Sequence, residues 1–188
     1  MHNGFLKLKP SAFIGLLAVL TICAPGPTYA QDQAKPLEVK YWPAQGSWRT
    51  TLLQRPTGDL MCMVNALGKE PHAFGVSIIE TPGSLMFAID DRNSTQGYLP
   101  TMAVQIDKDA PQVFTTFNDP PMTSTAPAEA TRVRVLVTRL ARGQSLTVDA
   151  RRAQYKLSLD GFRSAAAQLR ACRLEVATTP PGTVGRGN

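Results

Sequence analysis

Between Leu37 and Ser158 the chain is divided into short segments in which apolar and polar residues alternate. A period of two residues predicts strands that bury one face and expose the other. Turn residues such as Pro56–Asp59 and Pro82–Gly83 separate the segments, and these connections are too short for the crossovers that parallel strands need. We therefore expect an all-β fold, an antiparallel β-sandwich or flattened barrel of about nine or ten short strands.

The segment from Ser145 to Arg173 predicts the unit that closes this fold, a β-hairpin followed by one helix. Apolar residues first recur at every second position (Leu146, Val148 and Ala150, then Tyr155, Leu157 and Leu159). At Asp160, which we expect to be the helix N-cap, the spacing changes to three and four residues. The new apolar positions are Phe162, Ala165, Ala166, Leu169 and Cys172. We expect one C-terminal helix whose apolar face packs on the strands.

Two segments before this unit have less regular patterns. Asp119 to Ala130 is rich in proline, threonine, serine and alanine, which predicts a surface loop. Thr131 to Arg142 alternates at its valines, as a strand does, although its leucines also fit a short helix. For this segment we favour a strand that turns into a single helical turn stopped at Gly143.

The first thirty residues have the features of a secretory signal peptide. Lys7 and Lys9 precede an apolar run over 12–22, and Thr28-Tyr29-Ala30 provides a small-residue cleavage site. Cys23 leaves lipidation open, although bulky Ile22 fits a lipobox poorly. No later segment is long and apolar enough to span a membrane. We expect a periplasmic or secreted protein with one β-rich domain over 31–177 and a disordered tail over 178–188.

Two cysteines follow the predicted leader, Cys62 and Cys172. An isolated pair in an exported protein predicts one disulfide, and two separately buried thiols are the alternative. The bridge would close a loop of roughly 110 residues, for which the chain-entropy model gives at most about 4.7 kcal/mol of stabilisation.

Residues with catalytic or metal-binding chemistry are scarce after the leader. His72 is the single histidine there, too few for a histidine triad or a histidine metal site. Asp90, Asp91 and Asn93 offer oxygen ligands to calcium, but the segment lacks the glycine and the distal glutamate of a calcium loop. We therefore expect a non-enzymatic protein without a metal or cofactor, and a hydrolase with paired carboxylates stays an open alternative.

Charge is distributed unevenly along the chain. Residues 31–130 contain seven lysines and arginines against eleven acids, whereas residues 131–188 contain eleven against three. A clustered basic face suits an anionic polysaccharide, lipid headgroups or an acidic protein, and scattered charges would only keep the surface hydrated. Export and the lack of interleaved aromatic residues disfavour nucleic acid. The candidate contact residues are Arg132, Arg134, Arg151, Arg152, Lys156, Arg163 and Arg170.

Four stretches share one further pattern: the run Leu157–Phe162 with the small residues of the following helix, Leu140–Val148, Trp48 and Cys62. In these stretches the chain resembles the invasion-associated locus B family of exported bacterial proteins. The resemblance implies an all-β exported protein that acts in host-cell invasion or in the envelope, without an established catalytic site.

From these observations we expect a protein that binds a host or envelope partner, and an anionic partner is one candidate. The alternative is a periplasmic inhibitor or small-ligand-binding module that uses the loop over residues 119–130 as its contact.

Overall fold

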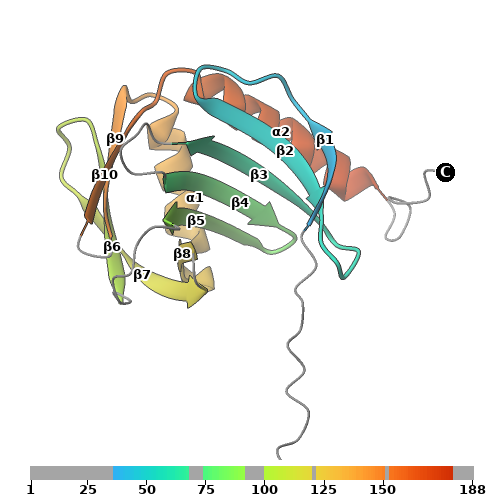
Figure 1. The fold of residues 1–188 in the computed structure, drawn as a ribbon, viewed down its shortest axis with the longest axis horizontal. Helices are drawn as coiled ribbons and strands as arrows, with labels where there is room; N and C mark the ends of the chain where they lie inside the picture. Colours follow the sequence, from blue (N-terminus) through green and yellow to red (C-terminus); the bar gives the residue numbers. More distant parts are fainter. Residues whose placement is uncertain (1–35, 68–73, 92–99, 120–121, 151–152, 180–188) are drawn as a thin grey trace, which may run out of the picture. The chain divides into compact units, whose positions relative to one another are not determined.

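The computed structural model describes residues 36–67, 74–91, 100–119, 122–150 and 153–179. In this part of the chain ten strands form one open sheet in the order β1-β2-β3-β4-β5-β8-β7-β6-β9-β10, and every neighbouring pair is antiparallel (Figure 1). The predicted all-β class with a closing C-terminal helix is confirmed. The strands are β1 (Leu37–Tyr41), β2 (Trp48–Gln54), β3 (Leu60–Leu67), β4 (Phe74–Thr81), β5 (Ser84–Asp91), β6 (Thr101–Ile106), β7 (Gln112–Asp119), β8 (Met122–Thr125), β9 (Ser145–Ala150) and β10 (Ala153–Ser158).

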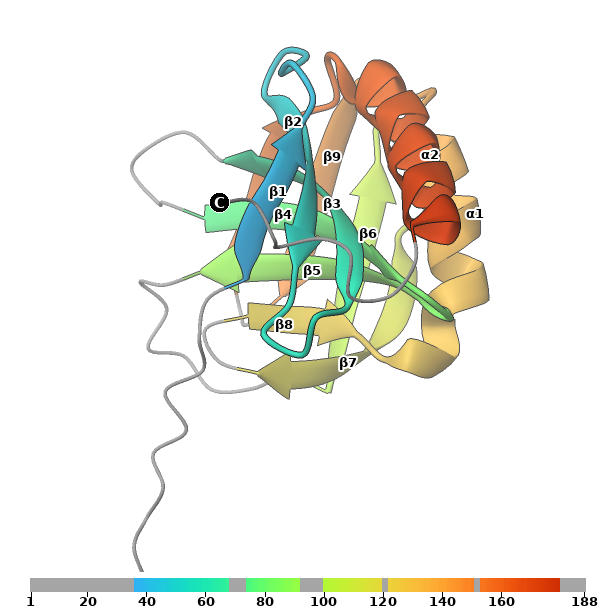
Figure 2. The same cartoon turned by 90° about the vertical axis from the view of Figure 1, so that its right-hand side faces the viewer.

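Two helices, α1 (Ala130–Leu140) and α2 (Phe162–Thr178), lie on the same side of the sheet, and a short 3-10 helix η1 (Pro127–Glu129) leads into α1 (Figure 2). The core lies between the helices and the sheet. Every apolar position predicted for the closing helix is buried (Phe162, Ala165, Ala166, Leu169 and Cys172). This helix therefore covers the sheet with the face that the sequence predicts.

Trp48 on β2 fixes the start of α2. Its ring meets the ring of Phe162 edge to face, with centroids 4.7 Å apart, and its indole N–H donates to the carbonyl of Ser158 at 3.0 Å. Two positions further along β2, the buried Thr50 hydroxyl donates to the carbonyl of Ala165. Burying two aromatic side chains while satisfying the indole N–H is strongly favourable. The first turns of α2 are consequently tied to β2 by both apolar and polar contacts.

The prediction that 131–142 form a strand turning into a single helical turn is wrong, because Ala130–Leu140 form the helix α1. Val133, Leu136 and Leu140, spaced three and four apart, are fully buried, whereas Val135 between them is 55% exposed. The buried residues therefore follow the helical spacing of three and four, and not the alternation of the valines. Packing against the sheet decides between two patterns that the sequence leaves balanced.

The prediction of a surface loop over 119–130 is also wrong. Strand β8 occupies Met122–Thr125, pairs with both β5 and β7, and buries Thr123, Ser124 and Thr125. The Thr125 hydroxyl accepts a hydrogen bond from the backbone N–H of Phe87 at 3.1 Å. Because their hydroxyls find such partners, these small polar residues fill an interior strand without a desolvation penalty.

The expected N-cap at Asp160 is displaced by one residue. Gly161 precedes α2 in a left-handed conformation with φ 82°, and no side chain caps the helix. A Cβ atom at Gly161 would lie 2.0 Å from the carbonyl oxygen of Gln45. The β1–β2 connection therefore presses directly on the backbone that enters α2, which leaves room for glycine alone.

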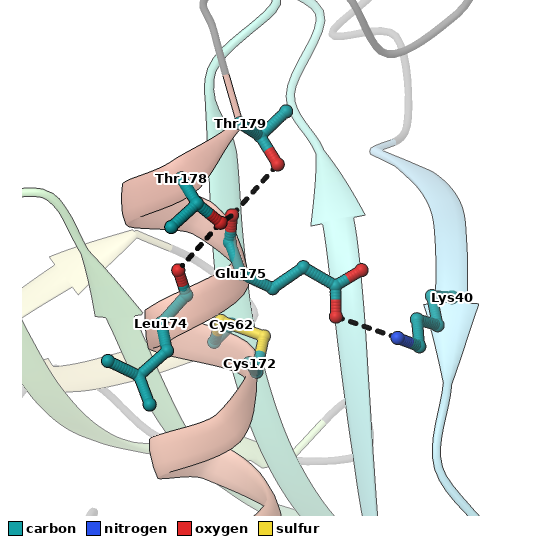
Figure 3. Close-up of polar contacts among 7 residues, drawn as sticks. All are labelled: Lys40, Cys62, Cys172, Leu174, Glu175, Thr178 and Thr179. Atoms are coloured by element: carbon teal, nitrogen blue, oxygen red, sulfur yellow. Dashed lines mark hydrogen bonds and ion pairs between the residues drawn. A yellow bond between two sulfur atoms is a disulfide. The ribbon is translucent and has the colours of Figure 1, made fainter.

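Cys62 on β3 and Cys172 on α2 form the disulfide that the cysteine count predicts, with Cα atoms 6.0 Å apart. Figure 3 shows this bond under the last turns of α2, together with the ion pair between Lys40 of β1 and Glu175 at 2.7 Å. Thr178 and Thr179 donate their hydroxyls to the carbonyl of Glu175. The C-terminal end of α2 is thus held to the sheet and has part of its last carbonyls satisfied.

Gly161→Ala should lower the free energy of unfolding by roughly 3 kcal/mol, since it combines left-handed strain with a backbone clash. Gly58→Ala is the matched control, because φ is +88° there and a Cβ would meet nothing within 4 Å. The control should lose only about 1–2 kcal/mol. Urea unfolding of both variants measures the difference, and equal losses would contradict the close approach at Gly161.

Replacing both cysteines (Cys62→Ala with Cys172→Ala) should lower the free energy of unfolding by about 2–5 kcal/mol, because the closed loop spans 110 positions. Reduction of the wild-type protein should produce a loss of similar size, while the double variant should not respond to reductant. Denaturant unfolding with and without reductant checks this, and mass analysis of the non-reduced protein checks the pairing. Two free thiols in protein purified without reductant would refute it.

Candidate binding surface

The two helices present a strongly basic layer to solvent. Together they carry six arginines and one acid, Glu175. The end of α1 lies beside the start of α2, because Arg163 donates to the carbonyl of Ala141 at 3.1 Å. The layer is therefore one continuous surface of two adjacent helices, and we call it the helix layer. Its arginines are Arg132, Arg134 and Arg139 on α1 and Arg163, Arg170 and Arg173 on α2.

Two arginines of the helix layer have partners that fix the fold. Arg132 pairs with Glu129 at 2.8 Å, donates to the carbonyl of Val113 and lies over the ring of Phe114. Arg139 pairs with Asp109 in the β6–β7 turn at 2.9 Å. Both side chains hold α1 to β7 and to the β6–β7 turn, so they are less available to an external partner.

Arg134 and Arg170 differ from these. Both side chains are exposed, and within the described residues neither guanidinium group has a hydrogen-bond or ion-pair partner, although the backbone carbonyl of Arg134 accepts from the Thr138 hydroxyl. An arginine without an internal partner keeps its five N–H donors for water or a ligand. These two side chains are the part of the predicted basic set best suited to contact an anion.

The structure does not gather the whole predicted set. Lys156 follows the buried Tyr155 on β10 and therefore faces away from the core and the helices. Arg151 and Arg152 lie outside the described residues. Arg173, which was not among the predicted residues, belongs to the helix layer and lies close to Arg134 around one cavity. Only the fold brings these two arginines together, since 39 positions separate them.

A cavity of about 420 Å³ opens between the β4–β5 turn and the two helices, and we call it the turn cleft. Arg134 enters it from α1, and Arg173 enters it from α2, where it also reaches Glu80 at 3.4 Å. The Ser84 hydroxyl is buried in the wall and has no hydrogen-bond partner. Apolar lining comes from Pro82, Val176 and Ala177. The cleft thus combines cationic donors, an unsatisfied hydroxyl and an apolar wall.

A second cavity, of about 360 Å³, lies at the opposite end of the helix pair. It is lined by the connection after α1, including Arg142, and by the start of α2, including Asp160 and Arg163. Arg163 is already engaged by the carbonyl of Ala141. None of the residues that line this second cavity has a buried polar side-chain atom without a hydrogen-bond partner, whereas Ser84 in the turn cleft has one.

Two carboxylates have lowered pKa values for structural reasons. The backbone N–H of Ser145 holds the pKa of Asp107 below its ordinary value, with further hydrogen bonds from the Gln144 N–H and the Ser145 hydroxyl. The N–H of Thr115 and then Arg132 lower the pKa of Glu129. Both groups stay ionised at neutral pH and hold turns in place, so neither is suited to act as a general acid.

The remaining candidates for metal chemistry receive no support from the geometry. Asp91 is buried and accepts a hydrogen bond from Tyr155, which lies 64 positions away. Among the residues that the structure describes, no group of three or more histidines, cysteines, aspartates or glutamates is placed to hold a metal ion. His72 and Asn93 lie outside the described residues.

Comparison with family models, with curated proteins and with solved structures finds no match for this chain. The resemblance to invasion-associated locus B proteins therefore stays a prediction from the quoted stretches. Within the described residues, neither helix has the length and apolar character to cross a membrane.

Asp107→Asn should flatten the acid dependence of stability. The folded-state pKa is lowered, so the stabilisation by Asp107 is complete above its ordinary pKa of 3.8 and is lost as the pH falls through the lower folded value. Wild type should therefore lose more stability than the variant between about pH 6 and about pH 3. Urea midpoints at the two pH values measure this, with the exposed Asp149→Asn as control. An identical loss in wild type and Asp107→Asn would contradict it.

Proposed function

We propose that this chain is an exported, non-enzymatic binding protein whose helix layer contacts an anionic partner in the bacterial envelope or on a host cell. The observation that carries the proposal is the set of six arginines on two adjacent helices that contain a single acid. Such a surface attracts polyanions over a distance and holds them by charge-assisted hydrogen bonds. Arg134 and Arg170 are the residues expected to make the first contacts.

Export is supported by the leader over residues 1–30 and by the disulfide. Disulfides persist in oxidising compartments such as the periplasm and the extracellular space, and the bond between Cys62 and Cys172 is compatible with a non-cytoplasmic protein. The resemblance to invasion-associated locus B proteins agrees with a binding role in the envelope or in host-cell invasion. It names no partner, so the chemistry of the helix layer defines the partner class.

The helix layer is better suited to binding than to catalysis. Its guanidinium groups are permanently charged and present planar arrays of donors that match carboxylate, sulfate and phosphate oxygens. They do not exchange protons at physiological pH, so they bind and orient anions without supplying an acid or a base. A catalytic reaction at this surface would need a nucleophile, a general base and a general acid from outside the helix layer.

Arg134→Gln combined with Arg170→Gln should weaken binding to heparin and to anionic liposomes. The double change removes two unengaged guanidinium groups from the helix layer and should lower both the eluting salt concentration and the salt dependence of binding. Arg55→Gln combined with Lys108→Gln is the matched control, because both residues are exposed on strand connections outside the helices. Retention and vesicle sedimentation measure the effect.

The two double variants change the net charge equally, so a general charge effect would shift both to the same extent. Equal retention of the two variants would contradict the proposal that the helix layer binds the polyanion. A loss confined to Arg134 and Arg170 supports it.

The alternative of an inhibitor or small-ligand module loses the contact loop that it was expected to use. Residues 122–125 form a strand paired on both sides, so deleting this segment would disrupt the sheet rather than test a binding loop. The turn cleft, a cavity lined by arginines and apolar residues, is the feature that favours small-ligand binding.

A further inference from the structure

We propose that the turn cleft binds a small monocarboxylate with an apolar body. Its volume of about 420 Å³ lies within the range of about 300–1,000 Å³ that is usual for small-molecule sites. This inference goes beyond the proposed polyanion surface, because the cavity shares Arg134 with that surface but has its own walls and its own unsatisfied polar group.

The two arginines of the cleft provide the site for an anionic head group. The Arg134 guanidinium has no hydrogen-bond or ion-pair partner among the described residues. Arg173 reaches Glu80 at a distance of 3.4 Å, longer than the roughly 2.7–2.9 Å of a strong charge-assisted hydrogen bond. Each guanidinium has five N–H donors. Most of the donors of both side chains are therefore available to a carboxylate that enters between the helices.

The Ser84 hydroxyl gives independent evidence for a ligand at this position. Its oxygen is buried and has no hydrogen-bond partner, although the great majority of buried polar side-chain atoms are satisfied. Ser84 begins β5, directly after the β4–β5 turn, and lines the same cleft as the arginines. Because Ser84 lines the cleft, rotation of its side chain would bring this O–H to a carboxylate oxygen of the ligand and remove the penalty of leaving it unpaired.

The charge balance and the apolar wall select the ligand class. Two arginines and Glu80 leave one excess positive charge in the lining, which balances a carboxylate better than a doubly charged phosphate monoester. Pro82, Val176 and Ala177 offer apolar surface beside the charged groups. A ligand with an apolar body would gain by covering that surface, whereas a free inorganic anion would not.

The wall formed by α2 is fixed before any ligand binds. Cys62 lines the cleft and is bonded to Cys172 one turn before Val176. The Lys40–Glu175 ion pair and the two terminal threonine hydroxyls hold the last turns of α2, as Figure 3 shows. A preorganised wall lowers the entropy lost on binding, so a small ligand suffices to bind measurably.

Isothermal titration calorimetry of the purified protein with phenylacetate tests the proposal. We expect binding of phenylacetate, with phenylacetamide and acetate each at least about tenfold weaker, because one lacks the charge and the other lacks the apolar body. Ser84→Ala and Arg134→Gln should each weaken phenylacetate binding about tenfold or more. Val176→Phe should block the cleft. Arg170→Gln, which changes the helix layer outside the cleft, should bind phenylacetate as the wild type does.

The proposal is overturned if phenylacetamide binds as well as phenylacetate, if Ser84→Ala binds as the wild type does, or if no titration shows heat at millimolar ligand. Tighter binding of phenyl phosphate would replace the monocarboxylate by a phosphate ester. Heparin retention of Ser84→Ala tests polyanion binding by the helix layer separately from monocarboxylate binding by the turn cleft. This substitution leaves every charge in place, so it should not change polyanion binding whether or not the cleft takes a ligand.

Discussion

The packing of α2 on β2 and β3 is the interaction on which the rest of the structure depends. At the start of the helix, Trp48 places its ring against Phe162 and its N–H on the carbonyl of Ser158. Towards the end, the disulfide joins Cys172 to Cys62 on β3. The aromatic contact of Phe162 and the disulfide of Cys172 lie nearly three turns of the helix apart. Together they prevent the helix from rotating or sliding, which fixes where every side chain on its outer face points.

That constraint explains how two distant arginines come to share one cavity. Because α2 is fixed along its length, Arg173 is held next to the β4–β5 turn, where Glu80 receives it. Arg134 arrives from α1, whose own position is set by the buried Val133, Leu136 and Leu140. The cleft between them is thus a consequence of core packing. The packing of the two helices places its polar groups, and the contact between Arg173 and Glu80 is the one ion pair that its described lining adds.

The sequence predicted those elements in which local pattern and burial agree. The alternation of the β9–β10 hairpin and the spacing from Phe162 to Cys172 each correspond to one buried face, and the structure uses that face. The prediction from the sequence was wrong where two patterns compete or where polar residues are buried. Val133 and Val135 suggest a strand, yet only one of them is buried. Thr123 and Ser124 are typical of loops, yet their hydroxyls donate to Asn118 and Phe117 across the β7–β8 pair. Partners of that kind cannot be predicted without the sheet order. For the same reason the predicted basic set contains four arginines of the helix layer, whereas Arg139, Arg173 and the cavity that Arg173 shares with Arg134 were not predicted.

Arg134 belongs to both proposed sites, and this has a thermodynamic consequence if both are occupied in the protein's natural setting. A carboxylate held by Arg134 in the turn cleft neutralises one of the unengaged charges of the helix layer. Polyanion binding would then be weaker in the presence of the small ligand, and linkage requires that the polyanion weaken the small ligand by the same factor. The effect needs no movement of the fold, because the disulfide and the Lys40–Glu175 pair hold α2 in one place. A rigid surface with one shared arginine therefore couples the two sites through charge alone, and raising the salt concentration would weaken the coupling wherever solvent reaches the charges.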